Sequence, residues 1–161
     1  MSRRFLALTL AALLLPAAAH AASSFSTWGP HVGFSTGPDQ VVFGGQLEMG
    51  NIAPQVDFVP GVDIGIGDNV TLISINGDFR YRIAVADAKW QPYAGAGVSL
   101  HFFSWDAGYG AHGSETRGGG SLLFGADVPT ASGNRFFVEG KIGIGDSPDF
   151  KATAGWNFKM R

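Results

Sequence analysis

Two residues with catalytic potential stand two positions apart, His112 and Ser114. A histidine that takes the proton of a serine hydroxyl makes that oxygen a nucleophile, and a carboxylate that orients the histidine completes the arrangement. Glu115 directly follows the serine. The three residues lie in a glycine-rich stretch, however, whereas catalytic groups need rigid support. A serine hydrolase is therefore kept as an alternative, and no catalytic residue is assigned.

Other site patterns in the chain are weak. Residues 108–113 satisfy the spacing G-x-G-x-x-G, but no strand–helix–strand pattern surrounds them, so we predict no dinucleotide site. The chain has no cysteine, which excludes disulfides and cysteine-ligated metals. His31 and His101 fall on polar faces and are interpreted as hydrogen-bonding residues. We expect no metal and no cofactor.

The N-terminal residues have the pattern of an export signal. Two arginines precede an apolar run at 5–15 and a small-residue stretch that ends at Ala21, which is typical of a cleaved secretory signal peptide. We therefore predict a signal peptide over residues 1–21 and one domain over residues 22–161. Cleavage removes 2 of the 11 Lys and Arg and leaves 9 against 13 Asp and Glu, a net charge of −4. An acidic chain lacks the basic surface of nucleic-acid-binding proteins.

Apolar and polar residues alternate with a period of two through the rest of the chain, as in strands with one apolar face. Clusters of Gly, Pro, Asn and Asp between the alternating stretches indicate turns. The predicted strands cover Trp28–Thr36, Gln40–Met49, Val56–Ile66, Val70–Ile83, Trp90–Phe102, Gly118–Val128, Arg135–Ile144 and Phe150–Met160. The one long connection is Ser104–Arg117. Eight strands with mostly short connections predict an up-and-down antiparallel barrel.

The polar faces of these strands carry as many acids as bases. A closed interior requires such pairing, because an unpaired buried charge costs several kcal/mol. Trp28, Trp90 and Trp156 lie on apolar faces near one end of the expected barrel, as in the aromatic girdle at a membrane interface. We therefore expect the apolar faces to meet lipid and a lumen charge network inside. Its members are Glu48, Asp57, Asp63, Asp78, Asp127, Glu139, Arg80, Arg82, Arg135, Lys141, Lys151 and Lys159.

With these features the chain resembles the small eight-stranded outer-membrane β-barrels, which include the opacity-type proteins and OmpX- or OmpA-like domains. The resemblance covers about residues 25–161, and the segment Ala154–Phe158 looks like the aromatic final strand that barrel-assembly machinery reads in that family. It implies an all-β, eight-stranded antiparallel transmembrane barrel after a cleaved signal peptide. It also implies the cell outer membrane as location, and outer-membrane lipid and lipopolysaccharide as partners. In that family both termini are periplasmic, which places Ser104–Arg117 outside.

An eight-stranded interior is just wide enough to be filled by side chains, so we expect no bulk pore and no enzyme activity. The remaining role is structural or one of surface contact. The sequence names no surface partner. We expect such a partner to contact Trp105, Asp106, Tyr109, His112, Glu115 and Arg117. Outward connections also carry an acidic rim that could meet lipopolysaccharide through divalent cations, formed by Asp39, Asp68, Asp106, Glu115, Asp146 and Asp149.

Two alternatives stay open. The pair of His112 and Ser114 followed by a carboxylate resembles the catalytic group of the outer-membrane lipid A deacylases, which implies an acyl hydrolase. A soluble periplasmic barrel with an apolar ligand cavity would instead turn the apolar faces inwards.

Overall fold

The computed structural model describes residues 25–67, 70–86, 89–106 and 112–160. The predicted signal peptide lies outside these ranges. Every regular element in the described residues is a β-strand. The strands are β1 (Phe25–Thr36), β2 (Gln40–Ala53), β3 (Val56–Gly67), β4 (Val70–Arg82), β5 (Gln91–Asp106), β6 (His112–Pro129), β7 (Arg135–Gly145) and β8 (Phe150–Lys159).

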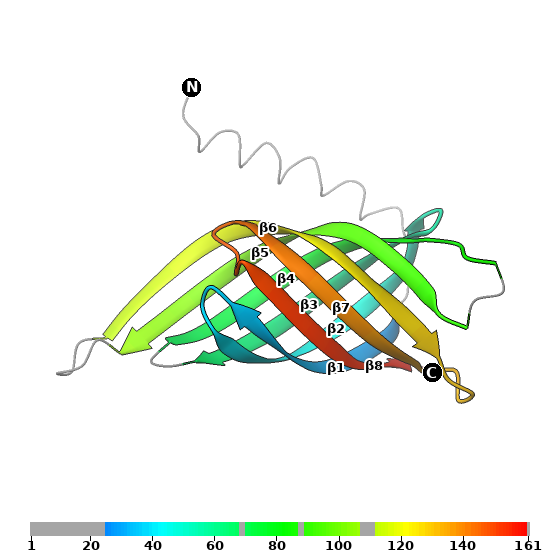
Figure 1. Cartoon of the computed structure of the whole chain (residues 1–161), viewed down its shortest axis with the longest axis horizontal. Helices are drawn as coiled ribbons and strands as arrows, with labels where there is room; N and C mark the ends of the chain where they lie inside the picture. Colours follow the sequence, from blue (N-terminus) through cyan, green and yellow to red (C-terminus); the bar gives the residue numbers. More distant parts are fainter. Residues whose placement is uncertain (1–24, 68–69, 87–88, 107–111, 161) are drawn as a thin grey trace, which may run out of the picture.

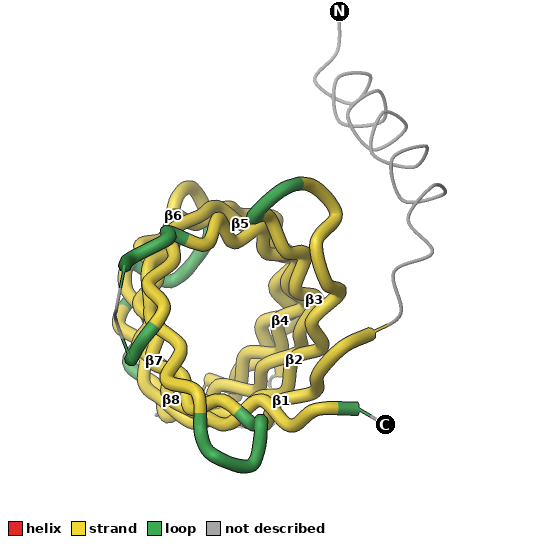
Figure 2. Tube along the Cα trace, turned by 90° about the vertical axis from the view of Figure 1, so that its right-hand side faces the viewer, coloured by secondary structure: helices red, strands yellow, loops and turns green. Residues whose placement is uncertain are grey.

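The eight strands close into one antiparallel barrel, because each strand pairs with its sequence neighbours and β8 pairs with β1 (Figure 2). The predicted all-β, eight-stranded antiparallel barrel is confirmed. The start of β1, the end of β8 and the β2–β3, β4–β5 and β6–β7 connections lie at one end of the barrel, here called the terminal end (Figure 1). The other four connections lie at the opposite end, called the hairpin end.

Strands β5 and β6 are the longest, at 16 and 18 residues. Their pairing runs without a shift from Gln91↔Asp127 to Asp106↔His112, and the resulting hairpin projects past the other strands at the left of Figure 1. The predicted long connection Ser104–Arg117 is therefore wrong, since the strands are separated only by residues 107–111, which lie outside the described ranges. The sequence shows no alternation of apolar and polar residues over 112–118 of β6, because both faces of the strand carry polar residues or glycine there.

Successive side chains of each strand point to opposite sides of the barrel wall. In β4, Leu72, Ser74, Asn76, Asp78 and Arg80 are buried, whereas Thr71, Ile73, Ile75, Phe79 and Tyr81 are exposed. Large apolar side chains are exposed in this way on all eight strands. The apolar faces thus point outwards, which does not fit the alternative of a soluble barrel with an apolar cavity. Among the described residues, no helix has the length and hydropathy needed to span a membrane.

Candidate functional site

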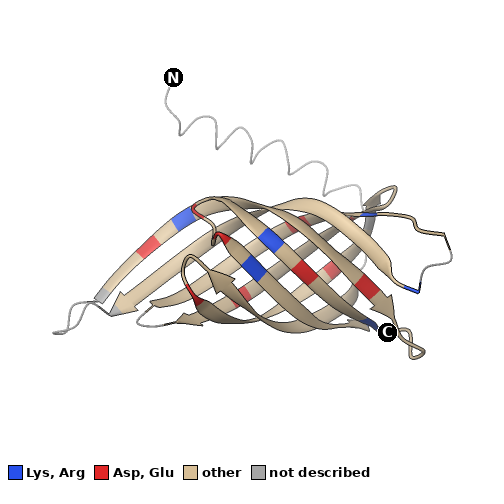
Figure 3. Ribbon diagram, in the orientation of Figure 1, with Lys and Arg blue, Asp and Glu red and all other residues tan. Residues whose placement is uncertain are grey.

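The interior face carries polar or charged side chains from every strand. The structure places most of the predicted lumen charges there. Figure 3 shows how acidic and basic positions are distributed over the strands of the barrel wall. Less than a tenth of the surface is exposed for Glu48, Asp57, Asp63, Asp78, Arg80, Asp127, Glu139 and Lys141. The side chains of Arg82, Arg135 and Lys151 are 12%, 22% and 13% exposed. These residues form three layers along the barrel axis.

The layer nearest the terminal end is built around Arg82. Its guanidinium pairs with Glu48 and Asp57, and Nη1 lies 2.7 Å from Oδ2 of Asp127. Arg135 pairs with the second oxygen of Glu48, which also accepts a hydrogen bond of 2.9 Å from the Thr27 hydroxyl. One arginine therefore ties β4 to β2, β3 and β6 across the lumen.

The middle layer centres on Arg80. Its Nη2 lies 2.7 Å from Oε2 of Glu139, and both side chains are 3% exposed. The guanidinium carbon lies 5.0 Å from the ring centroid of Tyr93 and 5.9 Å from that of Phe137, within the range of cation–π attraction. Lys141 pairs with Asp78 of β4 in the same region. The layer thus combines charge pairs with aromatic packing.

The third layer surrounds Asp63. Its carboxylate lies 2.7 Å from Nε2 of His31, accepts a hydrogen bond of 2.8 Å from the Asn76 amide and pairs with Lys151. The Ser99 hydroxyl donates to the Asn76 carbonyl oxygen at 2.8 Å. Charged side chains, the Asn76 amide and the Ser99 hydroxyl therefore form one continuous network that joins β1, β3, β4, β5 and β8.

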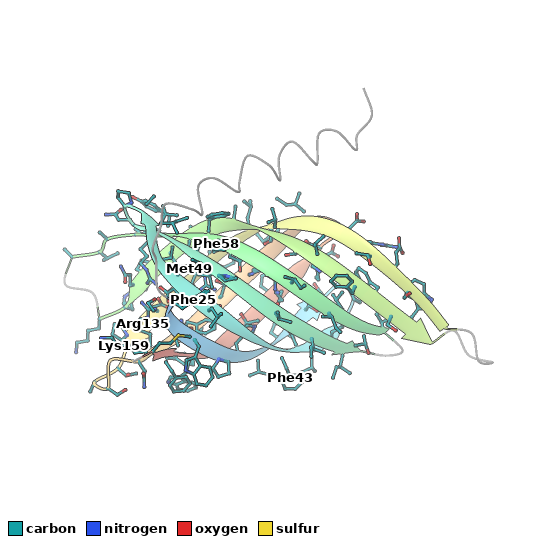
Figure 4. All side chains as sticks on the ribbon, turned by 180° about the vertical axis from the view of Figure 1, so that it is seen from behind. Phe25, Phe43, Met49, Phe58, Arg135 and Lys159 are labelled. Carbon is teal, nitrogen blue, oxygen red and sulfur yellow. The ribbon has the colours of Figure 1, made fainter. Side chains whose placement is uncertain are left out.

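The structure differs from the predicted network at one position and adds others. Lys159, expected inside, is exposed and lies near Arg135 at the terminal end (Figure 4). His31 contacts Asp63 instead, so six buried acids face five interior bases and one histidine. The fully buried Phe137 was missed because it is apolar on a polar face. Gln46 was missed because it is uncharged, although it accepts from Arg80 at 2.8 Å.

Two small cavities lie within the network. One of about 10 Å³ is lined by His31, Asp63 and Lys141 among others, and one of about 20 Å³ lies beneath Ser147 of the β7–β8 connection. A cavity needs about 10–15 Å³ to hold one water molecule. Ser147 also shares a hydrogen bond of 3.1 Å with Nε2 of the buried His101, which holds this connection over the hairpin end of the lumen.

The projecting hairpin brings together part of the predicted contact site. A side chain at Gly113 would collide with the Trp105 ring, so the indole lies across the opposite strand. Arg117 donates a hydrogen bond of 2.6 Å to Glu115, and its guanidinium carbon lies 5.4 Å from the Phe103 ring centroid. This bond lowers the pKa of the exposed Glu115 carboxyl. Of the other predicted contact residues, Tyr109 lies outside the described residues, as do the side chains of Asp106 and His112.

The structure separates the serine of the possible hydrolase site from the carboxylate that follows it. Ser114 and Glu115 are consecutive residues of β6, so their side chains point to opposite faces of the hairpin. Glu115 is hydrogen-bonded to Arg117. In the described residues, moreover, no three His, Asp or Glu side chains are grouped closely enough to hold a metal ion, and Asp68 of the expected acidic rim lies outside them.

Comparisons with known proteins support the fold. No family model matches the chain, and no curated protein matches it. The chain is similar to the N-terminal β-barrel domain of OprF from Pseudomonas aeruginosa, with a TM-score of 0.71, 12% identity and coverage of 86% of this chain and 98% of that chain. It is also similar to Neisserial surface protein A, with a TM-score of 0.60, 18% identity and coverage of 84% and 94%.

Both neighbours are small outer-membrane barrels, so the fold resemblance expected from the sequence is confirmed. A weaker likeness to the outer-membrane enzyme PagL, with a TM-score of 0.49 and 15% identity over 84% of this chain and 99% of that chain, supports no argument about activity.

Proposed function

We propose that this chain, which has the fold of the small outer-membrane barrels, is an outer-membrane protein with a closed lumen. Its role is to hold the β5–β6 hairpin at the cell surface for contact with other molecules, and it has no enzyme activity. The observation that carries this proposal is the inverted distribution of side chains: charge pairs inside the barrel and apolar side chains exposed around it.

The exposed apolar side chains support a membrane location. Trp28, Trp90 and Trp156 are 47–50% exposed, and all three lie near the terminal end. The Trp28 ring packs at a tilt against that of Phe158, with centroids 5.0 Å apart, and the Trp156 ring meets that of Phe136 edge-on at 4.6 Å. Aromatic rings at one height around an apolar belt are typical of a membrane interface. Outer-membrane lipid and lipopolysaccharide would then surround the barrel.

The interior contacts support a closed lumen. The Arg82 and Arg80 layers cross the barrel from side to side, and the two cavities within the charge network have volumes of only about 10 and 20 Å³. Because removing one partner of a buried charge pair costs about 3–5 kcal/mol, these pairs also resist opening. Bulk passage of solutes is therefore not part of the proposed function.

Two measurements test the proposal. The protein should fractionate with the outer membrane and change its gel mobility on heating, whereas a soluble periplasmic band would refute the location. In planar lipid bilayers the purified protein should give no steady conductance. A double variant, Arg80→Ala with Phe137→Ala, removes two large side chains from the middle layer and serves as the opened control. Steady conductance of the wild type would refute the closed lumen.

The absence of enzyme activity is tested separately. Ser114→Ala should leave the acylation of lipid A unchanged in cells that express the protein, because the structure directs Ser114 and Glu115 to opposite faces. A loss of deacylated lipid A on this substitution would restore the hydrolase alternative.

A further inference from the structure

One edge of β6 has no partner strand in the described residues at the hairpin end. The pairing of β6 with β7 begins at Gly119↔Gly145, whereas its pairing with β5 continues to His112. The far edge of β5 is covered by β4 as far as Trp105, opposite Val70. Residues 112–118 of β6 therefore form a free strand edge that projects past the barrel wall (Figure 1).

Two hydrogen bonds fix which backbone groups face this edge. The Ile83 N–H donates to the Pro92 carbonyl at 2.9 Å, so the even-numbered residues of β5 turn towards β4 and the odd-numbered ones towards β6. The shift-free register pairs odd residues of β5 with odd residues of β6. Even residues of β6 thus face away from β5. A second hydrogen bond leads to the same assignment: the N–H of Thr130, an even-numbered residue, donates to the Asn134 carbonyl on the β7 side at 2.8 Å.

Ser114, Thr116 and Gly118 consequently present their N–H and C=O groups on the free edge. Unpaired strand edges are templates for another strand, and proteins usually blunt them with charged side chains, above all lysine, with proline or with a bulge. Residues 112–118 contain neither lysine nor proline, and their register with β5 has no shift. Their two charged side chains, Glu115 and Arg117, are paired with each other. The edge therefore remains open to strand addition.

We propose that this edge binds an extended segment of a hydrophilic protein as an added β-strand. The proposal rests on the proposed function, which puts the hairpin end outside the cell. Backbone hydrogen bonds to Ser114, Thr116 and Gly118 would supply the affinity, and alternate side chains the selectivity.

The side chains beside the edge define the chemistry of the partner. On one face the hydroxyls of Ser114 and Thr116 are exposed, and a cross-strand Thr or Ser can form a hydrogen bond with such a hydroxyl. On the other face Glu115 and Arg117 form an exposed ion pair. A basic residue of an added strand could therefore contact Glu115, and an acidic one could contact Arg117. The structure thus favours a segment in which hydroxyl or β-branched residues alternate with charged ones.

Amide hydrogen exchange of the full chain in detergent micelles tests whether the edge is free. The amides of Ser114, Thr116 and Gly118 should exchange rapidly, whereas those of Glu115 and Arg117, which point towards β5, should be protected. Slow exchange at all five positions would overturn the proposal, because the edge would already be covered.

Selection from a displayed library of short random peptides tests strand addition. Peptides with alternating hydroxyl and charged residues should be enriched and bind the wild type. Thr116→Ala, which loses one side-chain pair but keeps the outward N–H, should lose at most about fivefold in affinity. Thr116→Pro, which lacks the outward N–H, should lose about tenfold or more. Ser114→Pro is a second blocking variant, and the heat shift on gels checks that each variant folds.

Absence of enrichment, or equal binding to Thr116→Pro, would overturn strand addition. Because the selection uses purified protein in detergent, it does not depend on where the protein resides. A failed membrane fractionation with successful selection would refute the location alone.

Discussion

Removing Arg80 alone should destabilise the barrel much more than removing Arg80 together with Glu139. Arg80 is 2% exposed, lies 2.7 Å from the Glu139 carboxylate and donates to Gln46 at 2.8 Å. In Arg80→Leu, Glu139 stays buried with Lys141 Nζ at 3.8 Å as the remaining cation nearby. Loss of one partner from a buried pair costs about 3–5 kcal/mol, and Lys141 keeps the expected cost near the lower end, at about 3 kcal/mol.

The double variant Arg80→Leu with Glu139→Leu removes both charges at once. Replacement of a buried pair by apolar residues is often close to neutral, and the lost hydrogen bond to Gln46 costs about 1 kcal/mol. We therefore expect it to be about 2 kcal/mol more stable than Arg80→Leu. Equilibrium unfolding by denaturant in lipid vesicles, followed by tryptophan fluorescence, measures both free energies. A double variant as unstable as the sum of the two single losses would refute this account of the interior.

The other predictions concern the lipid face, one turn and the hairpin. Val98→Arg, at a position 61% exposed on the outer face, should lower the free energy of unfolding in vesicles by about 2–4 kcal/mol, and an equal loss for Ser104→Arg on the projecting hairpin would contradict this. Gln55→Gly should raise the free energy of unfolding by about 0.5–1 kcal/mol in the same assay, because a φ of 64° suits glycine better than it suits glutamine; destabilisation would count against this. Arg117→Gln should raise the pKa of the Glu115 carboxyl in an NMR titration, since the charged form loses its hydrogen bond, and an unchanged pKa would show that the bond is not made.

The barrel wall was predictable from sequence because alternation depends only on the side to which a residue points. The height of a residue along the barrel axis, by contrast, produces no pattern in the sequence. Arg82 reaches carboxylates of three other strands only because those strands are staggered along the barrel axis. Lys159 follows the alternation of the interior face, but it is exposed because it lies beyond the last layer of charges. Phe137 shows a second limit, since an apolar residue fits a charged interior when an arginine stacks on its ring. Strand positions were therefore predictable, and charge partners were not.

The free edge of β6 lies where the surroundings of the barrel change. The outward-facing positions of β6 are apolar at Leu122 and Phe124, become glycine at 118 and 120, and carry hydroxyls at Thr116 and Ser114. Strand β7 ends opposite Gly119, at the same height. Unpaired backbone groups are not tolerated against hydrocarbon, but water can solvate them. Strand β6 thus loses its neighbour β7 only where the outer face of β6 itself has become glycine or polar, which is the arrangement expected if residues 112–118 stand in water beyond the membrane.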